Sequence, residues 1–217
     1  SATFEGMANP DGTTRDSLVG LTEELAKGEV GLIISSHAYV EPRGRVRASQ
    51  LGIHNDATVP GLARLADAAH AHGAATIVQL AHGGCTANEP VGEWVGPSAM
   101  TLPDGRSCRE LSKAEIRDIV QDFRRGARRA MDAGFDGVQI HSAHAYLLNE
   151  FLSPYFNHRT DEFGGALVNR ARMHLEVLRA IRSEVGDDVP VLIKINSEDF
   201  LDGGFTRKEM VEVARML

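Results

Sequence analysis

Apolar positions recur with helical spacing in five segments of the chain and form short continuous runs in four others. The helical spacing predicts helices over 18–27, 62–72, 112–133, 169–185 and 206–217. The continuous runs predict buried strands over 30–34, 75–80, 135–140 and 189–195. Because strands and helices alternate, we expect one domain of repeated βα units, with a parallel sheet covered on both faces.

Helix ends carry recognisable signals. Ser112 and Glu115 have the spacing of a capping box. In this motif the serine hydroxyl accepts a hydrogen bond from the amide of the glutamate, and the glutamate carboxylate accepts one from the amide of the serine. Glycines follow the first four predicted helices, as expected at helix ends, at 28, 73, 134 and 186.

The number of strands bears on the fold class. Predicted strands begin about 50 residues apart, so the eight units of a closed parallel barrel would need on the order of 400 residues. The chain has 217 residues, begins with what resembles the end of a strand and finishes in a helical pattern without a cap. We therefore expect a partial barrel, as a portion of a larger enzyme.

Charge and composition exclude several classes of partner. The formal net charge is −7 and no basic block is present, which is a poor match for nucleic acid. No apolar run approaches the roughly 20 residues of a membrane helix. Cys85 and Cys108 form no C-x-x-C motif, so we expect two unpaired thiols in a reducing compartment, the cytoplasm.

The strongest candidate chemistry follows the strand that ends at Ile140. His141, His144 and Tyr146 come directly after it, where working groups gather in parallel βα folds. His141 and His144 have opposite parity, so they share a pocket only if the strand ends or bulges between them. Two imidazoles and a phenol can hold a carbonyl oxygen and deliver a proton. The alternatives are a histidine that binds loop backbone beside a packed tyrosine, and a zinc site for which no third ligand is evident.

Three further polar residues lie in or after apolar strands. The Gln79 amide can donate one hydrogen bond and accept another, which suits the imide-like edge of a ring. Alternatively, it can bind to backbone groups. His82, before two glycines, is typical of a histidine that fixes a loop. Lys194, within an apolar strand, should be buried and either pair with Glu198 or Asp199 or face a ligand.

Four arginines cluster on the longest predicted helix, at 124, 125, 128 and 129. Their spacing is typical of a solvated outer face.

Several runs, taken together, closely resemble the signature of the Old Yellow Enzyme family of NADH:flavin oxidoreductases. The most specific is Asn-His-Arg-Thr-Asp-Glu-Phe-Gly-Gly at 157–165. The other matching runs, in family order, are 31–34, 44–45, 50–53, 79–83, 96–98, 141–154 and 169–172. The resemblance covers essentially the whole chain. The exact residues of the matching motifs are most similar to the branch of the family that includes 2,4-dienoyl-CoA reductase and trimethylamine dehydrogenase.

The resemblance implies a TIM barrel that holds FMN at the carboxyl ends of its strands. It implies that NADH or NADPH reduces the flavin, which then reduces an alkene conjugated to a carbonyl-type group. His141 and His144 would bind the oxygen of that group, and Tyr146 would supply the proton.

The resemblance also implies four cofactor-binding positions. Gln79 would bind the pyrimidine edge of the flavin, and Lys194 would lie where negative charge accumulates on reduction. Thr3 matches a first-strand position beside the ring, and His37 a second-strand position near it. The iron–sulfur cluster of some members is possible only outside this chain, since its cysteine run is absent.

Some positions depart from the family pattern. Arginine is common where Lys194 stands, and glycine or alanine where His37 stands, so the His37 side chain must point away or alter the pocket. Ala145 replaces a common glycine, which makes a left-handed backbone there less expected.

Mapped onto the family, 1–217 is a single partial FMN-binding domain with strands one to five, without strands six to eight or the phosphate site. We therefore expect this portion alone to bind FMN weakly or not at all. The alternatives are flavin-dependent amine oxidation or demethylation, an inactive fragment that folds by association, and metal-dependent hydrolysis. We expect a small-molecule substrate and no nucleic-acid or membrane partner, and exposed sheet edges would favour a homo-oligomer.

Overall fold

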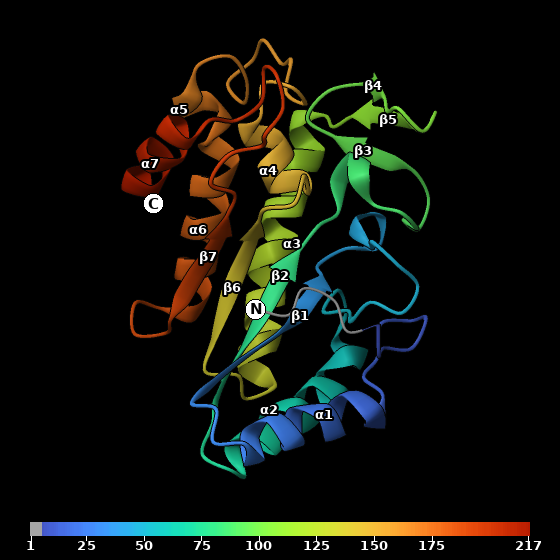
Figure 1. Cartoon of the computed structure of the whole chain (residues 1–217), viewed down its shortest axis with the longest axis vertical. Helices are drawn as coiled ribbons and strands as arrows, with labels where there is room; N and C mark the ends of the chain where they lie inside the picture. The colour runs from blue at the N-terminus through green and yellow to red at the C-terminus, as the bar shows by residue number, and fades with distance from the viewer. Residues whose placement is uncertain (1–5) are drawn as a thin grey trace.

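A four-stranded parallel sheet forms the centre of the computed structural model, which describes residues 6–217 (Figure 1). Its strands are β1 (Leu32–Tyr39), β2 (Ala75–Ala81), β6 (Gly137–Ser142) and β7 (Val191–Ile195). They lie side by side in the order β1-β2-β6-β7, so each new βα unit adds a strand at the same edge. This confirms the predicted α/β class and the parallel, barrel-type arrangement.

Four helices pack next to one another in chain order along the sheet. They are α1 (Asp16–Lys27), α2 (Val59–His70), α3 (Lys113–Asp132) and α6 (Arg172–Val185). α1 packs on α2, α2 on α3, and α3 on α6, which makes one continuous layer, with α3 and α6 behind the strands in Figure 1. The prediction of cover on both faces was wrong, because in a barrel the second face of the sheet is the interior.

The helix signals act as predicted. Ser112 Oγ accepts from the Glu115 amide while the Glu115 carboxylate accepts from the Ser112 amide, so α3 begins with a complete capping box. Thr206 and Glu209 repeat this arrangement at α7 (Arg207–Met216). The segment predicted as one helix over 169–185 is divided into α5 (Leu167–Arg170) and α6.

Strand β1 is longer than predicted and carries a bulge. It extends five residues past Ile34, the end of the apolar run, to Tyr39. Ile34 lies opposite Ile77, yet His37 and not Ser36 lies opposite Gln79, so β1 holds one extra residue between the two pairs. The bulge therefore decides which side chain of β1 meets Gln79.

A second, three-stranded sheet and a short helix were not predicted. The sheet has the order β3-β5-β4, from β3 (Trp94–Gly96), β4 (Met100–Thr101) and β5 (Ser107–Glu110). With α4 (Leu147–Leu152), it lies at the end of the molecule opposite α1 and α2 (Figure 1). These strands have two to four residues, too few to give a periodic pattern.

A disulfide joins Cys85 to Cys108, with 5.4 Å between their Cα atoms, so the prediction of two unpaired thiols was wrong. Cys85 lies in the short 3-10 turn η3 (Gly84–Thr86) after β2, and Cys108 in β5. Leu102, Phe156 and Trp94 pack around the pair. The sequence gives no hint of this proximity, because β5 reaches η3 only through the unpredicted small sheet.

The main core lies between the sheet and the helix layer. Its largest completely buried side chains include Leu62, Leu80, Ile116, Phe123 and Ile140. Within residues 6–217, no helix combines the length and apolar character that crossing a bilayer requires.

We expect the disulfide to stabilise the protein by about 3 kcal/mol, because it closes a loop of 23 residues in the unfolded chain. Reduction should lower the free energy of unfolding of the full-length protein by that amount in urea denaturation. A Cys85→Ala/Cys108→Ala variant should show the lower stability with and without reductant. Two reactive thiols in the unreduced, denatured protein would contradict the pairing.

Candidate active site

The end of β6 brings His141, His144 and Tyr146 together. The strand stops at Ser142, and His144 and Ala145 then adopt left-handed backbone, with φ of 63° and 58°. The turn removes the difference in parity, so the ring centroids of His141 and His144 lie 5.1 Å apart. The Tyr146 ring lies 5.0 Å from His141 and 6.3 Å from His144. The predicted grouping, and the strand end that it requires, are thus present.

Two asparagines hold this left-handed turn. Asn196 Oδ1 accepts from the His144 amide at 3.0 Å, and Asn149 Oδ1 accepts from the Ala145 amide at 2.8 Å. The Asn196 side chain also donates to Asn149 Oδ1 at 3.0 Å, and Asn149 donates to Asp199 Oδ1 at 3.1 Å. The turn is therefore tied to α4 and to the loop after β7.

The expectation that residue 145 is not in left-handed backbone was wrong, because Ala145 has a φ of 58°. A non-glycine residue pays a steric cost there, and the hydrogen bond from its amide to Asn149 is one of the contacts that offset it.

His141 is buried with both ring nitrogens lacking a hydrogen-bond partner among residues 6–217. Burial is the main cause that lowers the pKa of His141 to about 2, with smaller contributions from His37, His144 and Lys194. Burial and Lys194 also lower the pKa of His144. Both rings are therefore neutral near pH 7, and His141 presents an N–H and a lone pair for a ligand.

Gln79 lies in the interior, opposite Gln139 of β6. Its amide nitrogen donates to Gln139 Oε1 at 2.5 Å, and its own Oε1 is buried without a partner among residues 6–217. Gln79 thus offers an acceptor to a ligand N–H. Gln139 was missed, although a polar residue within the apolar run 135–140 is the same kind of signal that singled out Lys194.

His37 points toward this cluster and alters the pocket, the second of the two outcomes expected for it. Its ring centroid lies 5.7 Å from that of His141 and 5.5 Å from that of Tyr146. Burial is the largest cause that lowers the pKa of His37 to about 4, with smaller contributions from His144 and Lys194.

Lys194 lies opposite His141 in the register of β6 and β7. The prediction of a buried lysine was wrong: the side chain is partly exposed, because β7 is the outer strand of the described sheet. Partial desolvation still lowers its pKa. Glu198 pairs with Arg207 at 2.9 Å, and Asp199 accepts from Asn149 and from the Phe205 amide.

Tyr146 keeps its proton near neutral pH, because burial raises the pKa of its phenol, with a smaller opposing effect from Arg47. Thr3, the remaining predicted cofactor-binding residue, lies outside the described residues.

Two buried groups support the loop after β2. His82 bonds to Glu41 Oε1 at 2.7 Å and accepts from the Gly84 amide, as a loop-fixing histidine does. Glu150 is completely buried beside η3 and accepts from the Thr86 amide at 3.2 Å. Burial raises the pKa of Glu150 well above its usual range. Glu150 was not recognised from the sequence.

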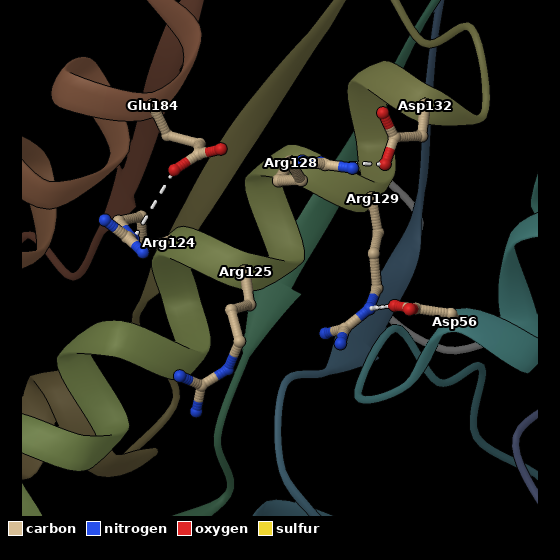
Figure 2. A pocket seen from close by; sticks show the side chains of 7 residues that line it. All are labelled: Asp56, Arg124, Arg125, Arg128, Arg129, Asp132 and Glu184. Atoms are coloured by element: carbon tan, nitrogen blue, oxygen red, sulfur yellow. Dashed lines mark hydrogen bonds and ion pairs between the residues drawn. The ribbon is translucent and has the colours of Figure 1, made fainter.

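The four arginines of α3 line a groove together with Asp56, Asp132 and Glu184 (Figure 2). Arg124 faces Glu184 at 3.5 Å, Arg128 faces Asp132 at 3.0 Å, and Arg129 faces Asp56 at 2.7 Å. Arg125 pairs with Asp122. Three of the arginines are well exposed, as predicted, whereas the Arg129 side chain is only 13% exposed. Because each charge has an opposite neighbour, the groove has little net attraction for anions.

Across the described range 6–217, no group of three or more His, Cys, Asp or Glu side chains is arranged to hold a metal ion. The zinc interpretation of His141 and His144 therefore finds no third ligand there.

Ala145→Gly should stabilise the full-length protein by about 1 kcal/mol, because glycine adopts left-handed backbone without the steric cost. Ala143→Gly is the control, since Ala143 lies two residues earlier in the chain, is buried and has no positive φ. We expect this control to be destabilised in the same urea titration. Equal destabilisation by both substitutions would contradict the strain.

The protein should lose stability as pH falls below the ordinary histidine pKa of 6.5. The folded-state pKa is about 4 for His37, about 2 for His141 and about 3 for His174, which is buried in α6. Between pH 6 and pH 5, the unfolded chain therefore holds about one more proton than the folded protein at each of these three histidines. His174→Gln should reduce the pH slope of the unfolding free energy by about one proton. An unchanged slope would contradict a buried neutral His174.

The comparisons with known proteins agree with this geometry. The model of the NADH:flavin oxidoreductase / NADH oxidase family matches residues 2–217. An "NADPH dehydrogenase" of Geobacillus sp. (strain WCH70) is 44% identical over 193 residues, 88% of this chain and 56% of the relative. An "NADH oxidase" of Thermoanaerobacter brockii is 37% identical over 97% of this chain and 33% of the relative. The chain thus spans only part of the length of either relative.

Solved structures share the fold. A 2-naphthoyl-CoA reductase in complex with 2-naphthoyl-CoA superposes with a TM-score of 0.95 and 36% identity, over all of this chain and 35% of that one. Morphinone reductase in complex with tetrahydroNAD gives a TM-score of 0.85 and 31% identity, over 99% of this chain and 66% of that one. The family match over nearly the whole chain, the solved folds and the strand-end site lead to one conclusion: this chain belongs to the NADH:flavin oxidoreductase / NADH oxidase family.

Proposed function

We propose that the complete protein is an FMN-dependent oxidoreductase that passes hydride from NADH or NADPH, through the flavin, to an alkene conjugated to a carbonyl-type group. The observation that carries the proposal is the grouping of His141, His144 and Tyr146 at the end of β6, with both nitrogens of His141 buried and unpartnered within residues 6–217. Relatives named NADPH dehydrogenase and NADH oxidase, and a neighbour bound to tetrahydroNAD, support the reductant.

The residues present fit a flavin ring. Gln79 Oε1 is a buried acceptor without a partner in the described part, which suits a ring N–H. Lys194, opposite His141, would place a positive charge beside the ring edge that becomes electron-rich. His37 and Thr3 complete the cofactor-binding residues that we propose. When bound, FMN would supply the hydride chemistry, which no amino-acid side chain provides.

The protein's own residues would bind and protonate the substrate. His141 and His144, both neutral, would donate to the carbonyl-type oxygen and stabilise the charge that develops there. Tyr146, whose raised pKa keeps the phenol protonated, would deliver a proton to the carbon that does not receive hydride.

The substrate is a small molecule in this proposal, and the neighbour bound to 2-naphthoyl-CoA indicates that the fold accepts a conjugated thioester. Amine oxidation is the competing reaction, and neutral donors suit a carbonyl oxygen better than an amine. Turnover of 2-cyclohexenone and of trimethylamine by the full-length enzyme, each with excess substrate, distinguishes the two. Turnover of the amine alone would overturn the proposal. A cytoplasmic location and a homo-oligomeric state stay predictions.

Tyr146→Phe should lower the rate of enone reduction by about 10²–10⁴-fold, because the proton donor is lost. Reduction of the flavin by NAD(P)H should change little, since it needs no proton from Tyr146. Anaerobic stopped-flow measurement of the two half-reactions separates these effects.

Tyr155→Phe is the control for that experiment, because Tyr155 is exposed and its ring meets that of Phe156 edge to face. It should leave both half-reactions unchanged. If Tyr146→Phe slowed both half-reactions equally, Tyr146 would not be the proton donor.

A further inference from the structure

We propose that Gln50 holds His37 as a neutral imidazole with its proton on Nε2, which makes His37 a further neutral hydrogen-bond donor beside His141 and Tyr146. Only the purpose of this donor rests on the proposed function. The protonation state itself follows from contacts among residues 37, 46 and 50.

The orientation of the Gln50 side-chain amide is fixed by backbone. Gln50 is buried, and its Oε1 accepts from the Val46 amide at 2.6 Å. A backbone N–H can only donate, so the oxygen of the Gln50 amide must face Val46. The NH₂ group therefore faces the other way. It lies 3.1 Å from the carbonyl oxygen of His37 and 2.6 Å from His37 Nδ1.

This orientation determines the tautomer of His37. The NH₂ group is a donor, so Nδ1 must present its lone pair and carry no proton. A neutral imidazole then has its only proton on Nε2. A second proton on Nδ1 would break the hydrogen bond from Gln50 and place two donors against each other, so the contact also opposes protonation of the ring.

The surroundings of His37 disfavour protonation as well. Burial is the largest cause that lowers its pKa to about 4, and it is joined by His144 of the left-handed turn and Lys194 of β7. The titratable rings nearest to it are those of His141 and Tyr146. Gln79, its partner across β1 and β2, is uncharged. Burial, His144 and Lys194 therefore all oppose an imidazolium at His37.

The bulge in β1 places this donor in the site. In a regular register from Ile34, without the bulge, Ser36 would lie opposite Gln79 and His37 would lie one position further along the strand. With it, the His37 ring lies within 6 Å, centroid to centroid, of both His141 and Tyr146. In the proposed function, the Nε2–H would donate to an electron-rich atom at the edge of the flavin ring, and this hydrogen bond would not depend on pH near neutrality.

The test is the protonation state of His37 in the full-length protein, without reductant or substrate. Long-range ¹H–¹⁵N correlation spectra of protein labelled with ¹⁵N-histidine distinguish protonated from unprotonated ring nitrogens. The signals that vanish in His37→Asn identify the residue. We expect Nε2 protonated and Nδ1 unprotonated from pH 5 to pH 8. Protonated Nδ1, or titration of His37 near pH 6.5, would overturn the proposal.

Gln50→Glu replaces the hydrogen-bond donor that faces His37 Nδ1 with an acceptor. A carboxylate facing Nδ1 accepts a proton there, so the pKa of His37 should rise by about 1–3 units and the ring should titrate within the measured range. Gln121→Glu on α3 adds the same charge away from the site and should leave His37 unchanged. An unmoved pKa in a folded Gln50→Glu variant would overturn the proposal.

The wild-type spectrum keeps the proposal falsifiable if Gln50→Glu does not fold, because the tautomer is read without any substitution at position 50. The same spectrum separates this inference from the proposed function. An enzyme that reduces enones but shows Nδ1–H at His37 would overturn the tautomer alone. A protein that shows the expected tautomer but no enone turnover would overturn the function alone.

Discussion

The left-handed turn after β6 is the constraint on which the candidate site depends. Two successive non-glycine residues, His144 and Ala145, adopt a conformation that side chains disfavour, and Asn149 and Asn196 accept hydrogen bonds from their amides. Asn149 belongs to α4 and Asn196 follows β7, so two different βα units hold one turn. This turn determines where the imidazole of His144 and the phenol of Tyr146 lie relative to His141. The local strain is thus offset by contacts that form only in the folded protein.

The cluster is built from neutral groups, of which His37 and His141 are buried. Burial keeps His37 and His141 uncharged and Tyr146 protonated, while the charge of Lys194 stays at the partly exposed edge. A neutral donor costs less to bury than an imidazolium, and it interacts strongly with a developing negative charge in a site of low dielectric. The protein therefore keeps hydrogen-bonding groups available in its interior without burying an unpaired charge.

The sequence predicted the βα alternation because long helices and apolar strands give strong periodic signals. It also predicted the meeting of His141, His144 and Tyr146, since the carboxyl end of a parallel strand is a defined place. It did not predict β3–β5 or the disulfide, which depend on strands of two to four residues and on a contact between distant loops. Asn149, Asn196 and Gln50 were not singled out for their side-chain contacts, because those contacts, with backbone amides and with other side chains, form only in the folded chain.

The bulge in β1 has a consequence for comparing relatives. Which side chain lies opposite Gln79 depends on the number of residues between Ile34 and that point, and not only on the identity of the residue there. Two chains aligned column by column can therefore place different residues at the same point in space if only one of them carries the bulge. A regular register from Ile34 would place Ser36 opposite Gln79, whereas deleting Ser35 or Ser36 would remove the bulge and leave His37 opposite Gln79.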